Sequence, residues 1–324
     1  MRFRKRSTHI TISDQEPGLP YSKGLTASQV MVTGLSPYRS YQVAEKIEDH
    51  LVARGIDSIA TEDLRNLTAR VLRDVAGERY AKNFVRWQEV GRLQVPLVIL
   101  IGGATGVGKS TVATQLAARL GIVRVVPTDA VREVMRGLFS QDLMPTLYTS
   151  SFEADAALRE PPPPPADKVI VGFREQTAAV AVGVRSLVER AAVEGTSMVI
   201  EGAHLVPGFL DVEQFATEVL AVPVVVTVED EELHRSHFVA RSADSAARPM
   251  DRYLNGFGNI RKVQKYIKSQ ALSRGWPVVA SYNLDQTIAS IIDLVVDRAE
   301  SWRGGRSAGM PADHVLELEG GKSR

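Results

Sequence analysis

The feature of this sequence that most constrains its fold is the glycine-rich segment Gly102–Thr111, GGATGVGKST. From Gly103 to Ser110 it matches G-x-x-x-x-G-K-[S/T], the pattern of a phosphate-binding loop, or P-loop. An apolar run precedes the segment and a helical pattern follows it, which is the strand–loop–helix context that such a loop requires. Because glycines let backbone amides turn toward an anion at a helix N-terminus, the segment predicts a nucleotide phosphate site in an α/β domain.

Each position of the P-loop has an expected role. We expect Lys109 to face solvent and to reach the β- and γ-phosphates, and the hydroxyl of Ser110 to bind Mg²⁺. Thr111 is placed to contact the α-phosphate. We therefore predict ATP and Mg²⁺ as cofactors, with nucleotide contacts from Gly103, Ala104, Thr105, Gly106, Val107, Gly108, Lys109, Ser110 and Thr111.

The sequence after residue 94 predicts the remainder of the α/β domain. Short runs rich in β-branched residues alternate with longer amphipathic segments, a pattern typical of a parallel sheet with helices on both faces. A run of five prolines, Pro161–Pro165, indicates an extended surface insertion before a long helix that begins near Asp167. We predict five parallel strands, at Val95–Ile101, Val123–Pro127, Ser197–Glu201, Val222–Val228 and Pro277–Ala280.

Residues 1–93 show a different pattern. Between residues 25 and 93 there is no strand pattern, and apolar residues recur at helical spacing, so we predict four short helices after a short strand at His9–Ser13. The length of 324 residues fits two domains. We expect a helical domain over 1–93, a P-loop domain over 94–302 and a flexible tail over 303–324.

Polar residues follow the second and third predicted strands of the sheet. Asp129 and Arg132 share one face of a helix start, where an acid can orient a hydroxyl and an arginine can bind a carboxylate or phosphate. Glu201 ends a buried strand, the usual position of an acid that holds Mg²⁺. We assign Asp129 and Glu201 to catalysis and leave open which of them orients the hydroxyl. Arg132 and His204 are candidate substrate contacts, although a capping pair and a loop histidine would also explain them.

Positive charge is concentrated in Leu233–Gln270, which holds eight lysines and arginines and two aspartates in a chain of net charge +1. Its middle, Ser242–Met250, is small and polar and predicts a mobile lid. Arginines on such a lid would stabilise a transferring phosphoryl group, so we assign Arg248 and Arg252 to catalysis and Arg241 to substrate binding. A solvated helix face is the alternative explanation for the lysines. His234 and His237 also share a helix face, but no third metal ligand is near them in the sequence.

Composition excludes several classes of function. The net charge of +1 provides no overall field for nucleic acid or an anionic membrane, and without cysteine there is no disulfide, thiolate zinc site or cysteine nucleophile. The basic start lacks the apolar stretch of a signal peptide, and no run is long enough to span a membrane. We expect a cytoplasmic protein that acts on a small anionic acceptor, with no nucleic acid or membrane partner. The sequence leaves a homodimer open.

The order of these features resembles the 2-phosphoglycerate kinase family. The resemblance is carried by Val199–Gly208 (VIEGAHLVPG), by H-x-x-H-F-x-x-R over His234–Arg241, and by R-x-x-Q-x-Y-I over Arg261–Ile267. It implies a P-loop kinase fold and transfer of the γ-phosphate of ATP to the 3-hydroxyl of 2-phosphoglycerate, giving 2,3-bisphosphoglycerate. A kinase for another hydroxyl acceptor, such as a sugar acid, nucleoside or nucleic-acid end, stays open, as does a nucleotide-sensing regulator without turnover.

The N-terminal half resembles an ATP-cone, a small nucleotide-binding domain. Leu19–Gly24 (LPYSKG) and Tyr80–Trp87 (YAKNFVRW) carry this similarity. The expected fold is thus a P-loop kinase domain with a five-stranded parallel sheet, preceded by a small helical ATP-cone-like domain. A helical packing domain without a ligand is the alternative for the first half.

Overall fold

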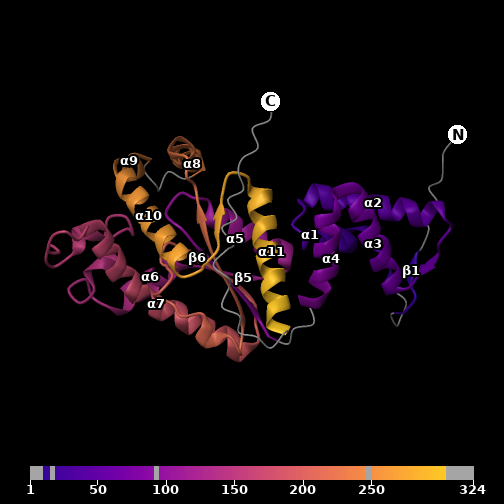
Figure 1. Ribbon diagram of the computed structural model, residues 1–324, viewed down its shortest axis with the longest axis horizontal. Helices are drawn as coiled ribbons and strands as arrows, with labels where there is room; N and C mark the ends of the chain where they lie inside the picture. Colours follow the sequence, from indigo (N-terminus) through magenta and orange to yellow (C-terminus); the bar gives the residue numbers. More distant parts are fainter. Residues whose placement is uncertain (1–9, 15–18, 91–94, 245–249, 304–324) are drawn as a thin grey trace. The chain divides into compact units, whose positions relative to one another are not determined.

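The structure is a computed structural model, and it describes residues 10–14, 19–90, 95–244 and 250–303 (Figure 1). The chain forms two compact units, Met1–Leu93 with Ile292–Glu300, and Gln94–Ile291 with Ser301–Arg324. The units are therefore not two simple halves of the sequence, because part of the last helix groups with the first unit. The predicted tail, 303–324, lies outside the described residues except for Arg303.

The second unit is built on a five-stranded sheet in which all neighbouring strands are parallel, as predicted. The strand order is β5-β6-β4-β7-β8, so the strand that leads into the P-loop is central. Its sequence, LVILIG, is buried at every position because it carries no polar side chain. Parallel strands end at one edge, where a site is expected. The strands are β4 (Leu97–Gly102), β5 (Arg124–Pro127), β6 (Met198–Gly202), β7 (Leu220–Thr227) and β8 (Val278–Ala280).

Helices cover both faces of this sheet. Figure 1 shows α5 and the first part of α11 on one side, with α7 and α10 on the other. The long helix α7 begins where predicted, and the carboxylate of Asp167 caps it by accepting from the N–H of Val169 at 2.9 Å. None of the described helices is both long and apolar enough to cross a membrane. The helices are α5 (Lys109–Leu120), α6 (Thr128–Leu138), α7 (Lys168–Glu194), α8 (Glu231–Asp244), α9 (Met250–Asn255), α10 (Phe257–Ser273) and α11 (Leu284–Arg303).

The chain between α6 and α7 forms the predicted insertion. It contains two 3-10 helices, η1 (Pro145–Tyr148) and η2 (Ala154–Ala157), and a third, η3 (Glu213–Phe215), precedes β7. Pro161–Pro165 contains no helix or strand, is mostly exposed and ends in a turn. Proline cannot donate a backbone hydrogen bond, which accounts for this irregular stretch.

The first unit contains the four predicted helices, α1 (Lys23–Met31), α2 (Pro37–Ala53), α3 (Thr61–Ala76) and α4 (Glu78–Val90). The predicted first strand is present as β1 (Thr11–Ile12), which pairs with β2 (Leu19–Pro20) and β3 (Ser58–Ile59). The expectation of no strand between residues 25 and 93 was wrong at β3, because two residues are too few to show an alternating pattern. Side chains from all four helices fill the core, including Val30, Ile47, Leu51, Leu72 and Phe84, and Leu35 between α1 and α2 joins them.

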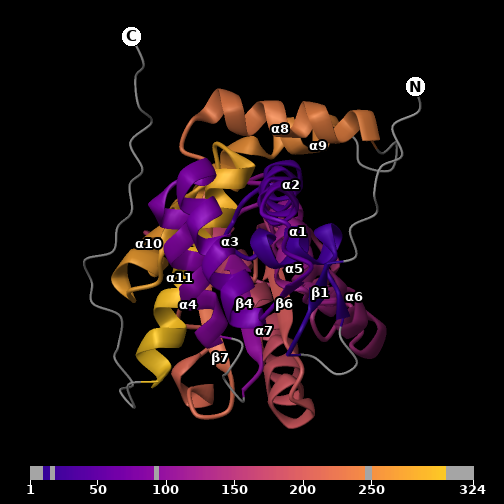
Figure 2. The same ribbon diagram turned by 90° about the vertical axis from the view of Figure 1, so that its right-hand side faces the viewer.

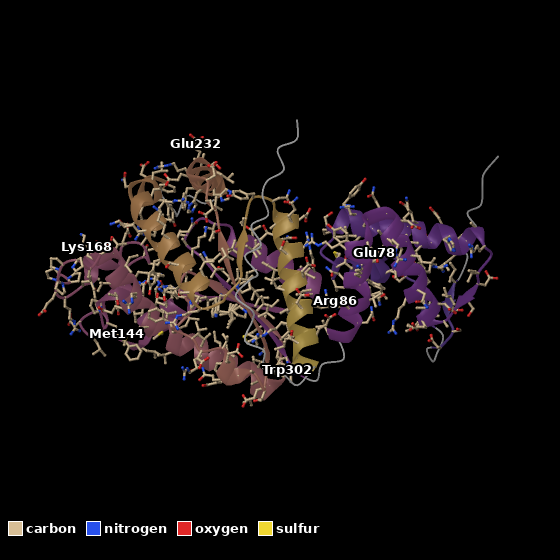
Figure 3. The ribbon with its side chains drawn as sticks, viewed as in Figure 1. Glu78, Arg86, Met144, Lys168, Glu232 and Trp302 are labelled. Atoms are coloured by element: carbon tan, nitrogen blue, oxygen red, sulfur yellow. The ribbon has the colours of Figure 1, made fainter. Side chains whose placement is uncertain are left out.

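A ladder of polar contacts joins α4 to residues 292–300 within the first unit. Arg79 and Asn83 both bond to Asp293, and Arg86 donates to Asp297 at 2.6 Å and to Glu300 at 2.7 Å. Figure 3 labels Arg86, whose side chain reaches toward α11. These carboxylates raise the pKa of Arg86, and its guanidinium lowers the pKa of Glu300. Most of the ladder is exposed, so each pair contributes about 1 kcal/mol or less.

Candidate active site

The P-loop joins the central strand β4 to α5. Gly103, Gly106 and Gly108 have φ values of 146°, 88° and 88°, which L side chains rarely adopt. Lys109 begins α5, and its Nζ donates to the carbonyl oxygen of Ala104 at 2.8 Å. The expectation that Lys109 faces solvent was wrong, because this bond folds the side chain over the loop and leaves it 8% exposed. The ammonium group is therefore held within the loop that is expected to bind phosphates.

A hydroxyl and a carboxylate meet beneath the P-loop. Ser110 Oγ donates to Glu201 Oε1 at 2.8 Å, and Glu201 is 6% exposed. Strand pairing explains the contact, because β4 and β6 are aligned with Ile101 opposite Glu201. Both groups are oxygen ligands of the kind that Mg²⁺ binds. Within the described part of the chain, no group of three or more histidines and carboxylates could hold a metal alone, so a cation here would need further oxygens, such as those of phosphates.

His204 lies in a buried hydrogen-bond network rather than at an exposed surface. Its Nδ1 contacts Thr128 Oγ1 and its Nε2 contacts Gln176 Oε1, each at 2.9 Å. The amide nitrogen of Gln176 in turn donates to the carbonyl oxygens of Thr146 and Thr149. Because the amide nitrogen is used as a donor, Nε2 of His204 must donate to Oε1 and Nδ1 must accept from Thr128. Burial lowers the pKa of His204 to about 4, so the ring is neutral near pH 7.

This network changes the expected role of His204. The side chain is 1% exposed and both ring nitrogens have protein partners, so the predicted substrate contact is not available in this arrangement. The ring instead links the start of α6 to the insertion through Gln176 of α7. A Cβ on Gly202 would lie 1.7 Å from Thr128 Oγ1, so this close approach requires glycine. Sequence reasoning missed Gln176, because nothing in its local pattern on a long helix distinguishes it.

Asp129 and Arg132 lie on the first turns of α6, and their environments differ. The carboxylate of Asp129 is 78% exposed, and its Oδ1 is 3.7 Å from Nε of Arg132. Nη1 of Arg132 donates to the carbonyl oxygens of Leu147 at 2.9 Å and Thr149 at 2.8 Å, and Nη2 donates to Glu133 at 2.8 Å. Arg132 thus anchors η1, and to bind an acceptor it would have to exchange these bonds.

The predicted lid is described only in part. Helix α8 continues to Asp244, so the first three residues of the predicted lid, Ser242–Asp244, are helical, and α9 begins at Met250. Figure 2 shows α8 and α9 side by side. Arg241 lies on α8, but its side chain is outside the described residues, as is all of Arg248.

Arg252 of α9 contacts the insertion. Its Nε is 3.0 Å from Glu153 Oε2 and its Nη2 donates to Ser150 Oγ at 2.8 Å. The carboxylate of Glu153 raises the pKa of Arg252. Half of the Arg252 side chain is exposed, so the pair is a surface contact that ties α9 to the segment before η2. Two of the lysines for which a solvated helix face was the alternative explanation have acidic partners: Lys262 contacts Asp167 at 2.8 Å, and Lys268 contacts Glu229 at 3.0 Å.

Two histidines of α8 contact the P-loop backbone. His234 Nε2 is 2.8 Å from the carbonyl oxygen of Thr105, and His237 Nδ1 is 2.8 Å from that of Gly106. Their shared helix face, which the sequence revealed, is thus directed at the loop. This target could not be found in the sequence pattern, because the two contacts join residues that are 129 and 131 positions apart.

The chain is similar to known proteins over most of its length. Residues 98–211 match a family model described as an AAA domain. The chain is 41% identical over 274 residues to the 2-phosphoglycerate kinase of Methanothermobacter thermautotrophicus, covering 84% of this chain and 89% of that protein. It is 39% identical to the enzyme of the same name from Methanocaldococcus jannaschii, covering 96% and 94%. For that of Methanopyrus kandleri the identity is 36%, covering 91% and 87%.

Proposed function

The chain belongs to the 2-phosphoglycerate kinase family, and from this premise we propose that it transfers the γ-phosphoryl group of ATP to the 3-hydroxyl of 2-phosphoglycerate. The hydroxyl oxygen forms a bond to the γ-phosphorus as the bond to the β,γ-bridging oxygen breaks. ADP leaves with that oxygen and its electron pair, the hydroxyl proton passes to a base, and the products are 2,3-bisphosphoglycerate and ADP. In this reaction we assign phosphate binding to Lys109, and cation binding to Ser110 and Glu201.

The observation that carries the proposal is the 2.8 Å contact between Ser110 and Glu201 beneath the P-loop. The loop amides and Lys109 would bind the triphosphate, with Lys109 exchanging the carbonyl oxygen of Ala104 for phosphate oxygens. Ser110 directly, and Glu201 directly or through water, would hold Mg²⁺, which neutralises phosphate charge when bound. The burial of Glu201 supports this role, because a carboxylate without a partner is costly inside a protein.

Exposure separates the two candidate bases. Glu201 is buried and already accepts a bond from Ser110, whereas Asp129 is 78% exposed at the edge where the parallel strands end. We therefore assign hydroxyl orientation and proton acceptance to Asp129, and cation binding to Glu201. Arg132 and Arg241 remain our candidates for the phosphate and carboxylate of the acceptor, because arginine binds both groups with paired hydrogen bonds.

An acceptor panel tests this function. ADP release is measured with ATP alone and with 2-phosphoglycerate, 3-phosphoglycerate, glycerate, gluconate or a nucleoside. We expect the fastest release with 2-phosphoglycerate, since a phosphorylated carboxylate gives several cationic groups a partner each. Turnover of a nucleoside with none of a phosphoglycerate would indicate a kinase for another acceptor. ATP binding without stimulated release by any acceptor would indicate a regulator.

A further inference from the structure

Helix α8 holds the middle of the P-loop through two histidines. We propose that His234 and His237 are positioning residues that fix the orientation of two P-loop peptide groups and so preset the loop for triphosphate binding. This inference rests on the proposed function only in taking the loop to bind ATP. The two rings reach consecutive carbonyl oxygens, those of Thr105 and Gly106, each at 2.8 Å.

The chemistry of these contacts fixes which group donates. A carbonyl oxygen can only accept, so Nε2 of His234 and Nδ1 of His237 must carry the protons. Nδ1 of His234 is then the acceptor of the ring, and it lies 3.4 Å from Nη1 of Arg261. His234 is fully buried, and burial lowers its pKa to about 4, which keeps the ring neutral near pH 7. Each histidine therefore supplies one defined donor to the loop.

Because a peptide group is planar, a hydrogen bond that fixes its carbonyl group also fixes the direction of its N–H group. In a trans peptide the C=O and N–H groups point in opposite directions. Holding the carbonyl of Thr105 toward α8 directs the N–H of Gly106 away from α8, and holding the carbonyl of Gly106 does the same for the N–H of Val107. Gly106 and Gly108 have positive φ values, and glycine backbone rotates easily between such states. The histidines therefore hold the part of the loop whose peptide groups would otherwise reorient most easily.

Packing keeps α8 against the loop. A Cβ on Gly106 would lie 2.3 Å from Cζ of Phe238, so no other residue fits beneath this ring. Phe238 is 1% exposed and stacks on His234, with centroids 5.5 Å apart, and on Tyr253 of α9, with centroids 5.1 Å apart. Phe238 therefore contacts both the P-loop, at Gly106, and α9, the helix that carries Arg252. The position of α8 and the orientation of the loop peptides are thus coupled.

Crossed isosteric substitutions separate hydrogen bonding from simple packing. The side-chain amide nitrogen of asparagine occupies the place of histidine Nδ1, and that of glutamine the place of Nε2. At position 237, where Nδ1 donates, His237→Asn keeps the donor and His237→Gln displaces it. At position 234, where Nε2 donates, the order reverses: His234→Gln keeps the donor and His234→Asn displaces it. Ser236→Ala is the control, because Ser236 is exposed on the same helix and bonds only to Leu233 among the described contacts.

Affinity for a non-hydrolysable ATP analogue is measured by calorimetry, with KM for ATP, kcat and the melting temperature of each variant. We expect the displaced-donor variants to bind the analogue about fivefold more weakly than their matched partners, the effect of about one hydrogen bond. We also expect KM for ATP to rise more than kcat falls, and Ser236→Ala to match the wild type.

Equal analogue affinity within each matched pair would overturn the inference. His237 is only partly buried, so its pair remains informative even if changes at the buried His234 prevent folding. Failure of the proposed function would look different, because the wild type would bind the analogue but release no ADP with 2-phosphoglycerate.

Discussion

The two units bury different kinds of side chain. In the first unit the buried polar groups among the described residues are neutral, namely Thr26, Thr33, Ser40, Thr68 and Asn83, and several of its charged side chains form ion pairs at or near the surface. In the second unit, the buried ionisable side chains among the residues that the structure describes are Lys109, Arg119, Glu201, His204 and His234. Burying an ionisable group is costly unless a partner compensates, so this difference indicates where the chemistry of the chain is performed.

The first unit has a pocket instead of buried charge. The pocket has a volume of about 550 Å³, and its lining residues include Tyr21, Phe84 and Trp87 with Arg65. Such a lining can bind a planar ligand through shape and stacking, but the described residues that form it include no carboxylate or histidine that could move a proton. The comparison therefore predicts catalysis in the second unit and, at most, binding in the first.

We expect the largest loss of activity from the substitution of Lys109. A small loss would contradict the conclusion that the second unit performs catalysis. Lys109→Ala removes the cation of the P-loop, and we expect kcat/KM to fall on the order of 10³-fold, the effect of losing a contact to developing phosphate charge. ADP release with 2-phosphoglycerate measures it, and Lys265→Ala, on an outer face of α10, is the control. Retention of more than a tenth of wild-type turnover would contradict a catalytic P-loop.

A smaller effect is expected at Arg252, where a catalytic and a docking role can be separated. Arg252→Ala should lower kcat/KM by about 10- to 100-fold if lid arginines position the phosphoryl group, whereas Lys265→Ala should change little. Glu153→Gln removes the partner of Arg252 without removing the cation. Activity near the wild-type level in Glu153→Gln supports a catalytic arginine. An equal loss in both variants would show that the ion pair only docks α9.

Much of the second unit could be predicted because its signals are local. The five strands are short runs rich in β-branched and other apolar residues, and the P-loop and the cap at Asp167 are short motifs. The strands β2 and β3 were missed because two residues carry no periodicity. The order of elements also placed Ser110 and Glu201 at one edge, since parallel strands end together.

The parts that could not be predicted depend on contacts between distant elements. The burial of Lys109 follows from a bond to a carbonyl oxygen, and backbone carbonyls have no sequence signature. The same is true of Arg132, which donates to the carbonyl oxygens of Leu147 and Thr149, and of the two α8 histidines. His204 was misplaced because its second partner, Gln176, lies on a helix that the sequence predicted but could not orient.

The buried histidines also predict a difference in pH dependence. The pKa of His204 is about 4 in the folded chain against an ordinary value of 6.5, so the unfolded chain binds a proton that the folded chain does not between these values. The stability contributed by the neutral ring is therefore complete above about pH 6.5 and is lost as pH falls toward 4. Urea unfolding at pH 7 and pH 5 should show a smaller loss of stability in His204→Gln than in the wild type. An equal loss would mean that His204 is not held neutral by burial.

The smallest expected effect concerns the pocket of the first unit. We propose that residues 1–93 form an ATP-cone-like unit that binds a second nucleotide and couples to activity by about 1–3 kcal/mol. Calorimetric titration of Lys109→Ala with an ATP analogue isolates this site, because the P-loop site is weakened. We expect weak residual binding that Trp87→Ala, within the pocket lining, removes, since the indole would lose its stacking contact. Val85→Ala is the matched control, because Val85 is exposed on the same helix. If Lys109→Ala shows no heat of binding, the first unit is a packing element without a ligand. The two units would then differ only in that the second performs catalysis and the first binds no nucleotide.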